Sequence, residues 1–375
     1  MLRVHSGQHY TYQYATPRVE TDFRMSRGAM RELGRRSPFL AGAIGCRVPA
    51  AAQLVHTYNG VPTTLKPFVV SCESFLPRIW NEGLPAKLKP LFQRILASDH
   101  CRAIVPMSEH AATLVRLRNA ESPHVARIAG KVAVIYPSVE KVDDGRTGPA
   151  LGSGPVTLTF VGRHFGRKGG IACLYLSDRL ERLGIRHEMH IVSIYESGPH
   201  IWTDTGEEYY RAQLREPRSS VSFHSRLSST DLAALLRRSH FALLPTIDET
   251  FGLSVLDAMA LGCVPLATGI RALPELVPSP ALLLRVETDA LGRWRHLPAS
   301  RERRCTADYR LLMDDVQHSL AEQAAATIGA LLDTPNLHAE LAEAGLARIR
   351  ARHHPVGQAQ VWSGLYHRCI DMLAN

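Results

Sequence analysis

The clearest indication of the fold is residues 241–267, FALLPTIDETFGLSVLDAMALGCVPLA. It begins with a run of strand-forming residues at 241–245, continues through a loop into helical spacing at 253–261, and ends in a second apolar run at 264–267. A strand, a helix and another strand in this order form a βαβ crossover, which places both strands parallel in one sheet. The stretch therefore predicts an α/β domain with a parallel sheet.

The same alternation continues on the N-terminal side of this stretch. Strand-like runs lie at 156–161, 187–192 and 220–223, and helical spacing occurs at 169–183 and 229–236. Repeated βαβ units build a doubly wound parallel sheet. We therefore predict a Rossmann-like domain in the second part of the chain.

The first part of the chain has the same rhythm more faintly. Residues 1–22 are short of apolar positions and show no clear first βα unit. Near the other end, helical spacing at 336–352 and 358–373 is divided by Pro355. The strands predicted in the first part are 53–56, 68–71, 103–106 and 132–136.

A polar segment rich in Gly and Pro, residues 143–155, is typical of a linker. A chain of 375 residues is long enough for two domains of ordinary size. We therefore expect an N-terminal Rossmann-like domain at 1–148, a C-terminal one at 149–350, and a final helix at 351–375.

The composition excludes several classes of protein. With 45% hydrophobic and 21% charged residues, neither a disordered chain nor a coiled coil is expected. No apolar run reaches the ~20 residues that cross a bilayer, and the first residues lack the apolar stretch of a signal peptide. The seven scattered cysteines form no Cys-x-x-Cys pair, which argues against a disulfide framework or a structural zinc site. A cytoplasmic location is expected.

The net charge of +9 is confined to the first part of the chain. Residues 1–150 contain 20 Lys and Arg against 11 Asp and Glu, whereas residues 151–375 contain 24 of each kind. The first part is therefore expected to meet an anionic partner, and this excess alone allows either nucleic acid or an acidic membrane surface.

Two loops at the carboxyl ends of predicted strands carry residues suited to chemistry, because open α/β sheets bind ligands at that edge. The first loop lies in FVGRHFGRKGG, residues 160–170. Arg163, Arg167 and Lys168 there precede a predicted helix, whose free N–H groups favour an anion. This pattern favours a phosphate site, and a solvated basic loop is the alternative.

The second loop lies in PTIDETFGLSVLD, residues 245–257. Glu249 ends the loop, Gly252 lets a ligand approach the backbone closely, and Asp257 follows on the predicted helix. The two carboxylates could accept hydrogen bonds from hydroxyl groups at opposite ends of one polyhydroxylated ligand. Alternatively, Glu249 is only a carboxylate at a helix start and Asp257 only a surface residue.

Together the two segments resemble the retaining glycosyltransferases of the GT-B fold, family 4 (glycosyl transferases group 1), with their Glu-x7-Glu motif. FVGR…RKGG is followed, after about 75 residues, by PTIDETFGLSVLDAMALGCVPLAT, in the order and setting of that family. The first part resembles the family more weakly, in the segments LVHTYNG, KPFVVSCES, AIVPMSEHAATL and VAVIYPSVE. The resemblance implies an α/β protein of GT-B architecture: two Rossmann-like domains facing across a cleft, an acceptor-side N-terminal one and a C-terminal one that binds the nucleotide sugar. The C-terminal helix would pack back on the N-terminal domain.

The resemblance also assigns roles by position. Arg163 and Lys168 would hold the diphosphate of a nucleotide-sugar donor, and Glu249 would contact hydroxyl groups of the sugar. Asp257 stands where the family has its second Glu, so its side chain reaches the ribose ~1.5 Å less far, and a water or a closer helix must compensate. The remaining donor-binding positions are Thr250, Phe251 and Gly252, through their backbone N–H groups, and Leu253.

The first domain departs from the family pattern. Glu73 stands where family members commonly carry a His near the reacting carbon of the sugar. It could accept a sugar hydroxyl, position the acceptor, or act as a base if burial raised its pKa; the alternative is a helix-capping Glu. His56 and His110 are further acceptor-side candidates, each with a packed or capping histidine as the alternative. The family's glycine-rich loop after the first strand is missing, and only Gly7 and its neighbours could replace it.

The reaction that the resemblance implies is transfer of a sugar, with retention of anomeric configuration, from a UDP- or GDP-linked donor. The acceptor would be a glycan, a lipid-linked molecule or a small molecule, as in polysaccharide biosynthesis. The catalytic residues would be Arg163, Lys168, Glu73 and Glu249. A carboxylate nucleophile gives the simplest covalent route, and front-face substitution assisted by the leaving group stays open.

Neither a metal nor another cofactor is expected. The chain has no Asp-x-Asp pair to hold a divalent cation against a diphosphate, so Arg163, Lys168 and helix N-termini would meet the charge of the leaving group. Two alternatives to a transferase stay open: a nucleotide-sugar epimerase on the same architecture, and a non-catalytic anion-binding scaffold.

Four arginines in the basic first part have helical spacing. At intervals of three, four and four residues they would form one stripe on a helix, a pattern of amphipathic helices at anionic membranes. A solvated helix face is the alternative. A lipid-linked acceptor at the inner membrane face would explain both the stripe and the charge, whereas 7% aromatic residues, none among the arginines, argue against nucleic acid. The stripe consists of Arg24, Arg27, Arg31 and Arg35.

Overall fold

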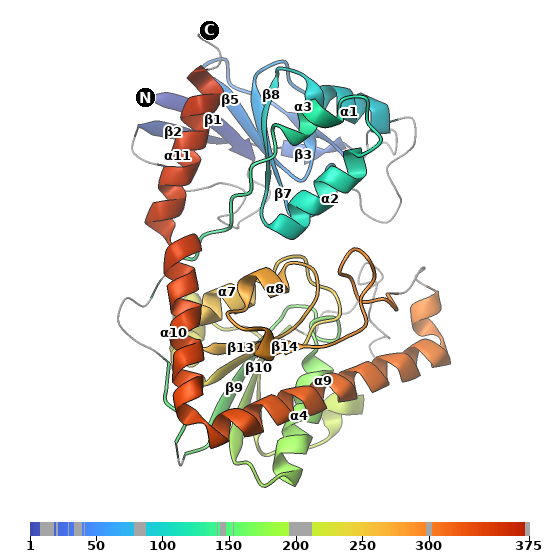
Figure 1. The fold of residues 1–375 in the computed structure, drawn as a ribbon, viewed down its shortest axis with the longest axis vertical. Coiled ribbons are helices and arrows are strands. Elements are labelled where there is room, and N and C mark those ends of the chain that lie inside the picture. Colours follow the sequence, from blue (N-terminus) through green and yellow to red (C-terminus); the bar gives the residue numbers. More distant parts are fainter. Residues whose placement is uncertain are drawn as a thin grey trace. The chain divides into compact units, whose positions relative to one another are not determined.

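The computed structural model divides the chain into two compact units. Unit 1 is Met1–Ser138 with Arg352–Asn375, and unit 2 is Val139–Ala351. Figure 1 shows a sheet with flanking helices in each. The residues that the structure describes are 1–7, 19, 22–28, 30–33, 40, 42–78, 88–140, 142, 148–152, 154–194, 212–297 and 302–371.

Unit 2 is built on a parallel sheet whose strand order is β11-β10-β9-β12-β13-β14. Both faces of its central strands are covered, and every residue of β12 and β13 is buried, as expected for a parallel sheet between helices. The strands are β9 (Val156–Val161), β10 (His187–Val192), β11 (Val221–His224), β12 (Phe241–Leu244), β13 (Val264–Thr268) and β14 (Leu283–Leu284). The helices between them are α4 (Gly170–Arg182), α6 (Ser229–Arg237), α7 (Leu253–Met259), α8 (Leu273–Leu276) and the 3-10 turn η3 (Pro280–Leu282). The predicted Rossmann-like domain is confirmed.

Unit 1 contains a second parallel sheet, of order β2-β1-β5-β7-β8. The polar N-terminus does form the first strand, because β1 finds two partners and pairs with both β2 and β5. The strands of this sheet are β1 (Leu2–Gly7), β2 (Phe23–Gly28), β5 (Leu54–Tyr58), β7 (Phe68–Cys72) and β8 (Cys101–Pro106). A small sheet adds β3 (Met30–Glu32), β4 (Ala43–Cys46) and β6 (Val61–Pro62), and the helices are α1 (Lys89–Ala97), α2 (Glu109–Asn119) and α3 (Val125–Ala129).

The strand predicted at 132–136 is wrong. Only Val132 pairs, in an isolated bridge with Ile104 of β8, and the following residues form no strand. A run of β-branched residues needs a neighbour over several residues to become a strand, and this one finds a single bridge.

Three helices end the chain: α9 (Ala307–Asp333), which follows the short 3-10 turn η4 (Arg303–Cys305), α10 (Pro335–Arg352) and α11 (Pro355–Asp371). Helix α9 was not predicted from the sequence. It packs along α4, where the Tyr175 ring stacks on His318 with centroids 3.8 Å apart. Helix α11 belongs to unit 1 and shares a hydrophobic cluster with its sheet (Figure 1). The cluster includes Val4, Leu54, Val69, Trp362, Leu365 and Tyr366.

The predicted helical stripe of arginines is wrong. Arg24 and Arg27 lie in β2 and Arg31 lies in β3, whereas Arg35 is outside the described residues. Strand β2 pairs in parallel with β1 over six residues, from Phe23 to Gly28, and this tertiary pairing overrides helical spacing. The structure therefore removes the basis on which a membrane-binding helix was expected.

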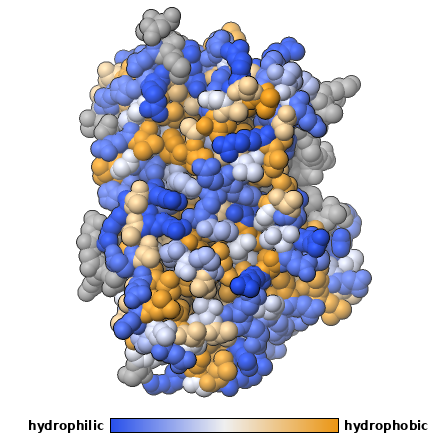
Figure 2. Space-filling view, viewed as in Figure 1, coloured by the Kyte–Doolittle hydropathy of each residue, from blue (hydrophilic) through white to orange (hydrophobic). Residues whose placement is uncertain are grey.

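The described part of the chain contains no helix that is both long and apolar enough to span a membrane. On the face shown in Figure 2, hydrophilic and hydrophobic residues are interspersed.

Candidate functional site

Two loops of unit 2 meet at the carboxyl ends of β9 and β12. We call residues 162–169 loop A and residues 245–252 loop B. The Lys168 ammonium of loop A forms an ion pair with the Glu249 carboxylate of loop B. Next to it, Arg167 Nη1 donates to the carbonyl oxygen of Asp248 at 2.5 Å and lies 3.6 Å from its carboxylate. The structure thus brings together residues that are about 80 positions apart in the chain.

Glycine at position 169 permits this close approach. Gly169 has φ +91° and precedes the first turn of α4. A Cβ atom there would lie 2.0 Å from the carbonyl oxygen of Pro245 in loop B, well inside contact distance. Any other residue would push the two loops apart.

We expect Gly169→Ala to destabilise the protein by more than Gly184→Ala does. Gly184 also has a positive φ, +70°, but open space around its Cβ position, so its substitution isolates the backbone strain of ~1–2 kcal/mol. The collision with Pro245 adds an overpacking cost of ~1–3 kcal/mol at position 169. Urea unfolding of both variants measures the difference, and equal losses would contradict the proposed contact between the loops.

The Glu249 carboxylate is ionised and held in place. Its Oε1 accepts hydrogen bonds from the backbone N–H of Thr250 at 2.8 Å and of Phe251 at 3.4 Å, while Oε2 faces Lys168. Burial alone would raise the pKa of Glu249, but the Lys168 and Arg167 charges and the Thr250 amide overcome it and lower the pKa to about 2. Burial lowers the pKa of Lys168, and Glu249 partly opposes this. Glu249 is therefore suited to accept hydrogen bonds, not to shuttle protons near neutral pH.

This lowered pKa predicts an acid-dependent loss of stability. The folded pKa of about 2 lies below the ordinary value of 4.5, so the ionised group stabilises the fold above pH 4.5 and loses that effect as the pH falls towards 2. The full contribution is roughly 3 kcal/mol, and more than half of it is gone by pH 3. Unfolding free energies of wild type and Glu249→Gln, measured from pH 7 to pH 3, are expected to converge. A gap that stays constant would contradict the assignment.

The other predicted donor-side residues surround this pair. The N–H groups of Thr250 and Phe251 donate to Glu249 itself, and Gly252, with φ +103°, precedes α7, which begins at Leu253. Asp257 lies on α7 with its side chain exposed.

Arg163 and Arg271 complete the cations of this region. Arg163 is exposed in loop A, and its carbonyl oxygen accepts from Ser193 Oγ at 3.4 Å. Arg271 follows β13, and its Nη2 lies 2.7 Å from Asp248 Oδ1. Neither Asp248 nor Arg271 was predicted from the sequence, although their places after β12 and β13, at the ligand-binding edge of the sheet, could have indicated them.

In unit 1, Glu73 follows the carboxyl end of β7. Its carboxylate forms an ion pair with Arg78 and accepts hydrogen bonds from Asn59 Nδ2 at 3.0 Å and from the Tyr58 hydroxyl at 3.3 Å. The Glu73 N–H donates in turn to Asn59 Oδ1 at 3.1 Å. A cation and two hydrogen-bond donors therefore hold the Glu73 carboxylate in one orientation.

His56 is fully buried, and both of its ring nitrogens are occupied. Nδ1 lies 2.7 Å from the Tyr366 hydroxyl of α11 and Nε2 lies 2.9 Å from Ser71 Oγ. Burial lowers the pKa of His56 to about 3, so the ring is neutral. This geometry suits the packing of α11 on the sheet and leaves no ring nitrogen for a substrate.

The other acceptor-side candidates lie near the same edge of that sheet. His110 is the second residue of α2 and is half-buried, and Gly7 ends β1 opposite Gly28. Among the residues that the structure describes, no group of three or more His, Cys, Asp or Glu side chains is placed to hold a metal ion.

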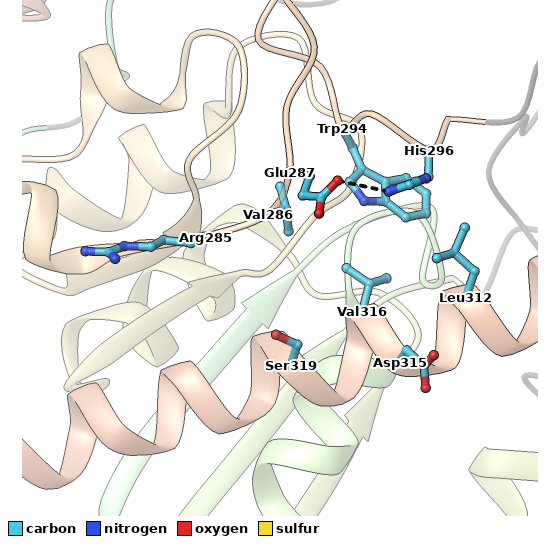
Figure 3. A pocket seen from close by; sticks show the side chains of 9 residues that line it. All are labelled: Arg285, Val286, Glu287, Trp294, His296, Leu312, Asp315, Val316 and Ser319. Atoms are coloured by element: carbon cyan, nitrogen blue, oxygen red, sulfur yellow. Dashed lines mark hydrogen bonds and ion pairs between the residues drawn. The ribbon is translucent and has the colours of Figure 1, made fainter.

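A separate hollow of about 470 Å³ lies on unit 2 between residues 285–296 and α9. Trp294 closes one side, the Glu287 carboxylate lies 3.3 Å from His296 Nε2, and Leu312 and Val316 of α9 form the floor (Figure 3). Arg285 extends away from the Trp294 ring. The rim carries charges of both signs, so its chemistry points to no particular ligand.

The segment that contains both loops is similar to a known protein family. Residues 155–291, which include loops A and B, match the model of the family "Glycosyl transferases group 1". No curated protein matches the sequence.

Solved structures share the fold over most of the chain. A glycosyltransferase from Rickettsia africae ESF-5 is 15% identical, with a TM-score of 0.58 over 85% of this chain and 77% of that one. Sucrose-phosphate synthase from Thermosynechococcus elongatus is 18% identical, with a TM-score of 0.56 over 86% and 74%. A UDP-forming α,α-trehalose-phosphate synthase from Burkholderia xenovorans, in complex with glucose-6-phosphate, is 11% identical, with a TM-score of 0.51 over 84% and 72%.

At these identities the solved structures establish the fold alone: two Rossmann-like units with C-terminal helices, as in GT-B enzymes. The family match, which spans the two facing loops, supports an enzyme that transfers glycosyl groups.

Proposed function

We propose that this protein is a retaining, metal-independent glycosyltransferase of family 4 type that uses a UDP- or GDP-linked sugar. The observation that carries the proposal is the buried Lys168–Glu249 pair, which joins loops A and B inside the segment that matches the family model. Lys168 offers a cation for the diphosphate, and Glu249 beside it offers a fixed hydrogen-bond acceptor for sugar hydroxyl groups. A site that binds a nucleotide sugar needs both groups close together.

Each charged group has a distinct task in the proposed reaction. Lys168 and Arg163 stabilise the negative charge that grows on the departing diphosphate, and Glu249 orients the sugar through its hydroxyl groups. The bond between the anomeric carbon and the diphosphate oxygen breaks, and its electron pair leaves with the diphosphate. The acceptor oxygen bonds to the anomeric carbon on the same face, and its proton passes to the departing phosphate oxygen.

Glu73 would serve the acceptor side in this scheme. Its carboxylate is held by Arg78 and Asn59, so it can receive a hydroxyl group without moving. The acceptor would be a glycan, a lipid-linked molecule or a small molecule. A cytoplasmic location and contact with an anionic membrane stay predictions, the latter now resting on the basic excess of residues 1–150 alone.

A panel of UDP- and GDP-sugars, incubated with and without sugar acceptors, tests the proposal. We expect release of nucleoside diphosphate that depends on the acceptor, with a product that keeps the anomeric configuration of the donor. Isomerisation of a donor without any acceptor would identify an epimerase instead. If the protein neither turns over nor binds any nucleotide, the result favours a non-catalytic anion-binding scaffold.

The same assay is expected to be insensitive to EDTA. The proposed site meets the charge of the diphosphate with Arg163 and Lys168, so removal of divalent cations should change kcat by less than about twofold. A strict requirement for magnesium would contradict the metal-independent mechanism.

A further inference from the structure

Asp248 joins two arginines from different segments of unit 2. Arg167, from loop A, lies 3.6 Å from Asp248 Oδ2, and Arg271, from the loop after β13, lies 2.7 Å from Oδ1. The neighbouring Lys168–Glu249 pair adds one charge of each sign. Three cations and two carboxylates therefore share one place at the carboxyl edge of the sheet.

Among the residues that the structure describes, this cluster has three cations and two carboxylates, which leaves a net charge of +1. Its five side chains are at most 25% exposed, so water screens them poorly, and each carboxylate is already paired. A cation that is mostly withdrawn from water is stabilised by a counter-ion. The cluster therefore attracts one further anionic group.

Arg271 is the member whose conformation calls for an explanation. Its φ is +46°, in the left-handed region that an arginine seldom adopts, and its N–H donates to the carbonyl oxygen of Gly292 at 2.8 Å. Its buried Nε has no hydrogen-bond partner within the described part of the chain, although Nη2 is paired with Asp248. Such strained positions tend to occur where a side chain must be presented to a ligand.

We propose that Arg271, steadied by Asp248 and assisted by Arg167, binds an anionic group of the nucleotide-sugar donor, either a phosphate or a carboxylate on the sugar. This inference rests on the proposed function, and it adds a donor contact from the β13 loop to those of loops A and B. Asp248 acts as a tether: it keeps the Arg271 guanidinium at the site before the ligand arrives, which lowers the ordering cost of binding.

Arg271→Gly is the sharpest variant. Glycine adopts a φ of +46° without strain, and Asp248 keeps Arg167 as its partner, so the variant is expected to fold with little change in stability. Arg285→Gln, which changes an exposed arginine of the same unit, is the matched control. Isothermal titration calorimetry would measure binding of inorganic pyrophosphate, UDP, UDP-glucose and UDP-glucuronate to the full-length chain.

We expect Arg271→Gly to weaken binding about tenfold or more, Arg271→Lys to restore part of the loss, and the control to bind as wild type. If the variant loses affinity equally for UDP, UDP-glucose and UDP-glucuronate, the anion that Arg271 binds is a phosphate. If it loses affinity for UDP-glucuronate alone, the anion is the carboxylate of the sugar. Wild-type affinity of Arg271→Gly for every ligand overturns the inference.

Failure of the proposed function gives a different result. If the wild-type protein binds pyrophosphate but no nucleotide, the proposed transferase activity is contradicted. The affinity of Arg271→Gly for pyrophosphate then still tests whether Arg271 binds an anion. Wild-type protein that binds none of the four ligands, and does not bind GDP or a GDP-sugar either, would overturn both.

Discussion

Replacement of Glu249 by alanine is expected to slow glycosyl transfer by two to three orders of magnitude, or about 10²–10³-fold. The carboxylate is held by two backbone N–H groups and by Lys168, so in the proposed reaction it is a preset acceptor for sugar hydroxyls. Loss of one preset hydrogen-bonding group in an enclosed site typically lowers kcat by ~10²–10³. Steady-state kinetics with the best donor of the panel measures the effect.

Stability must be separated from catalysis in this experiment. Removing one partner of a buried ion pair costs ~3–5 kcal/mol because the other charge is left unpaired. Circular dichroism and thermal unfolding therefore accompany the kinetics. The double variant Lys168→Met with Glu249→Gln removes both charges, keeps similar volumes, and should recover much of the stability but none of the activity.

Glu287→Ala is the matched control for Glu249. Glu287 is an exposed carboxylate of the same unit, in the hollow beside α9, and its loss should leave transfer unchanged. Turnover of Glu249→Ala close to that of wild type would refute a role for Glu249 in the reaction.

Replacement of Lys168 by alanine is expected to weaken nucleoside diphosphate binding by ~1.5–3 kcal/mol, or roughly 10- to 150-fold in Kd. The ammonium is mostly buried and ionised beside Glu249, so its attraction for a phosphate is little screened by water. Calorimetric titration with UDP and GDP measures the change. In kinetics the effect should appear in both KM and kcat, because the charge on the leaving group increases in the transition state.

Lys89→Ala provides the control for Lys168. Lys89 forms an exposed ion pair with Glu121 in unit 1, at 3.2 Å, and exposed pairs of this kind contribute ~0–1 kcal/mol. An unchanged Kd for Lys168→Ala would contradict a contact between this lysine and the diphosphate.

Much of unit 2 could be predicted from local pattern. Its strands and helices have apolar positions with the period of their own structure, so β9, β12 and α7 were recognised within a few residues. The rule that ligands bind at the carboxyl edge of parallel strands then singled out the loops that contain Lys168 and Glu249.

Unit 1 was harder to predict, because its strands depend on distant partners. The segment at 23–28 has the charge spacing of a helix but becomes β2 because β1 lies beside it, whereas 132–136 has strand-forming residues and finds only one bridge. Helix α9 is interrupted by no proline, yet its mixed polar and small residues gave no clear apolar stripe.

The order of the elements in unit 2 and the residue types of its two loops follow from the sequence alone, because both depend on neighbours along the chain. Which polar side chains pair with one another depends on the tertiary fold. Asp248 pairs with Arg167 and Arg271, and His56 with Tyr366, 310 positions away, because the register of the sheet and the packing of the helices bring these atoms within hydrogen-bonding reach. Ion pairs and hydrogen bonds form only when the two groups come within a few ångströms of each other. The number of residues between two groups in the sequence does not show whether they come that close.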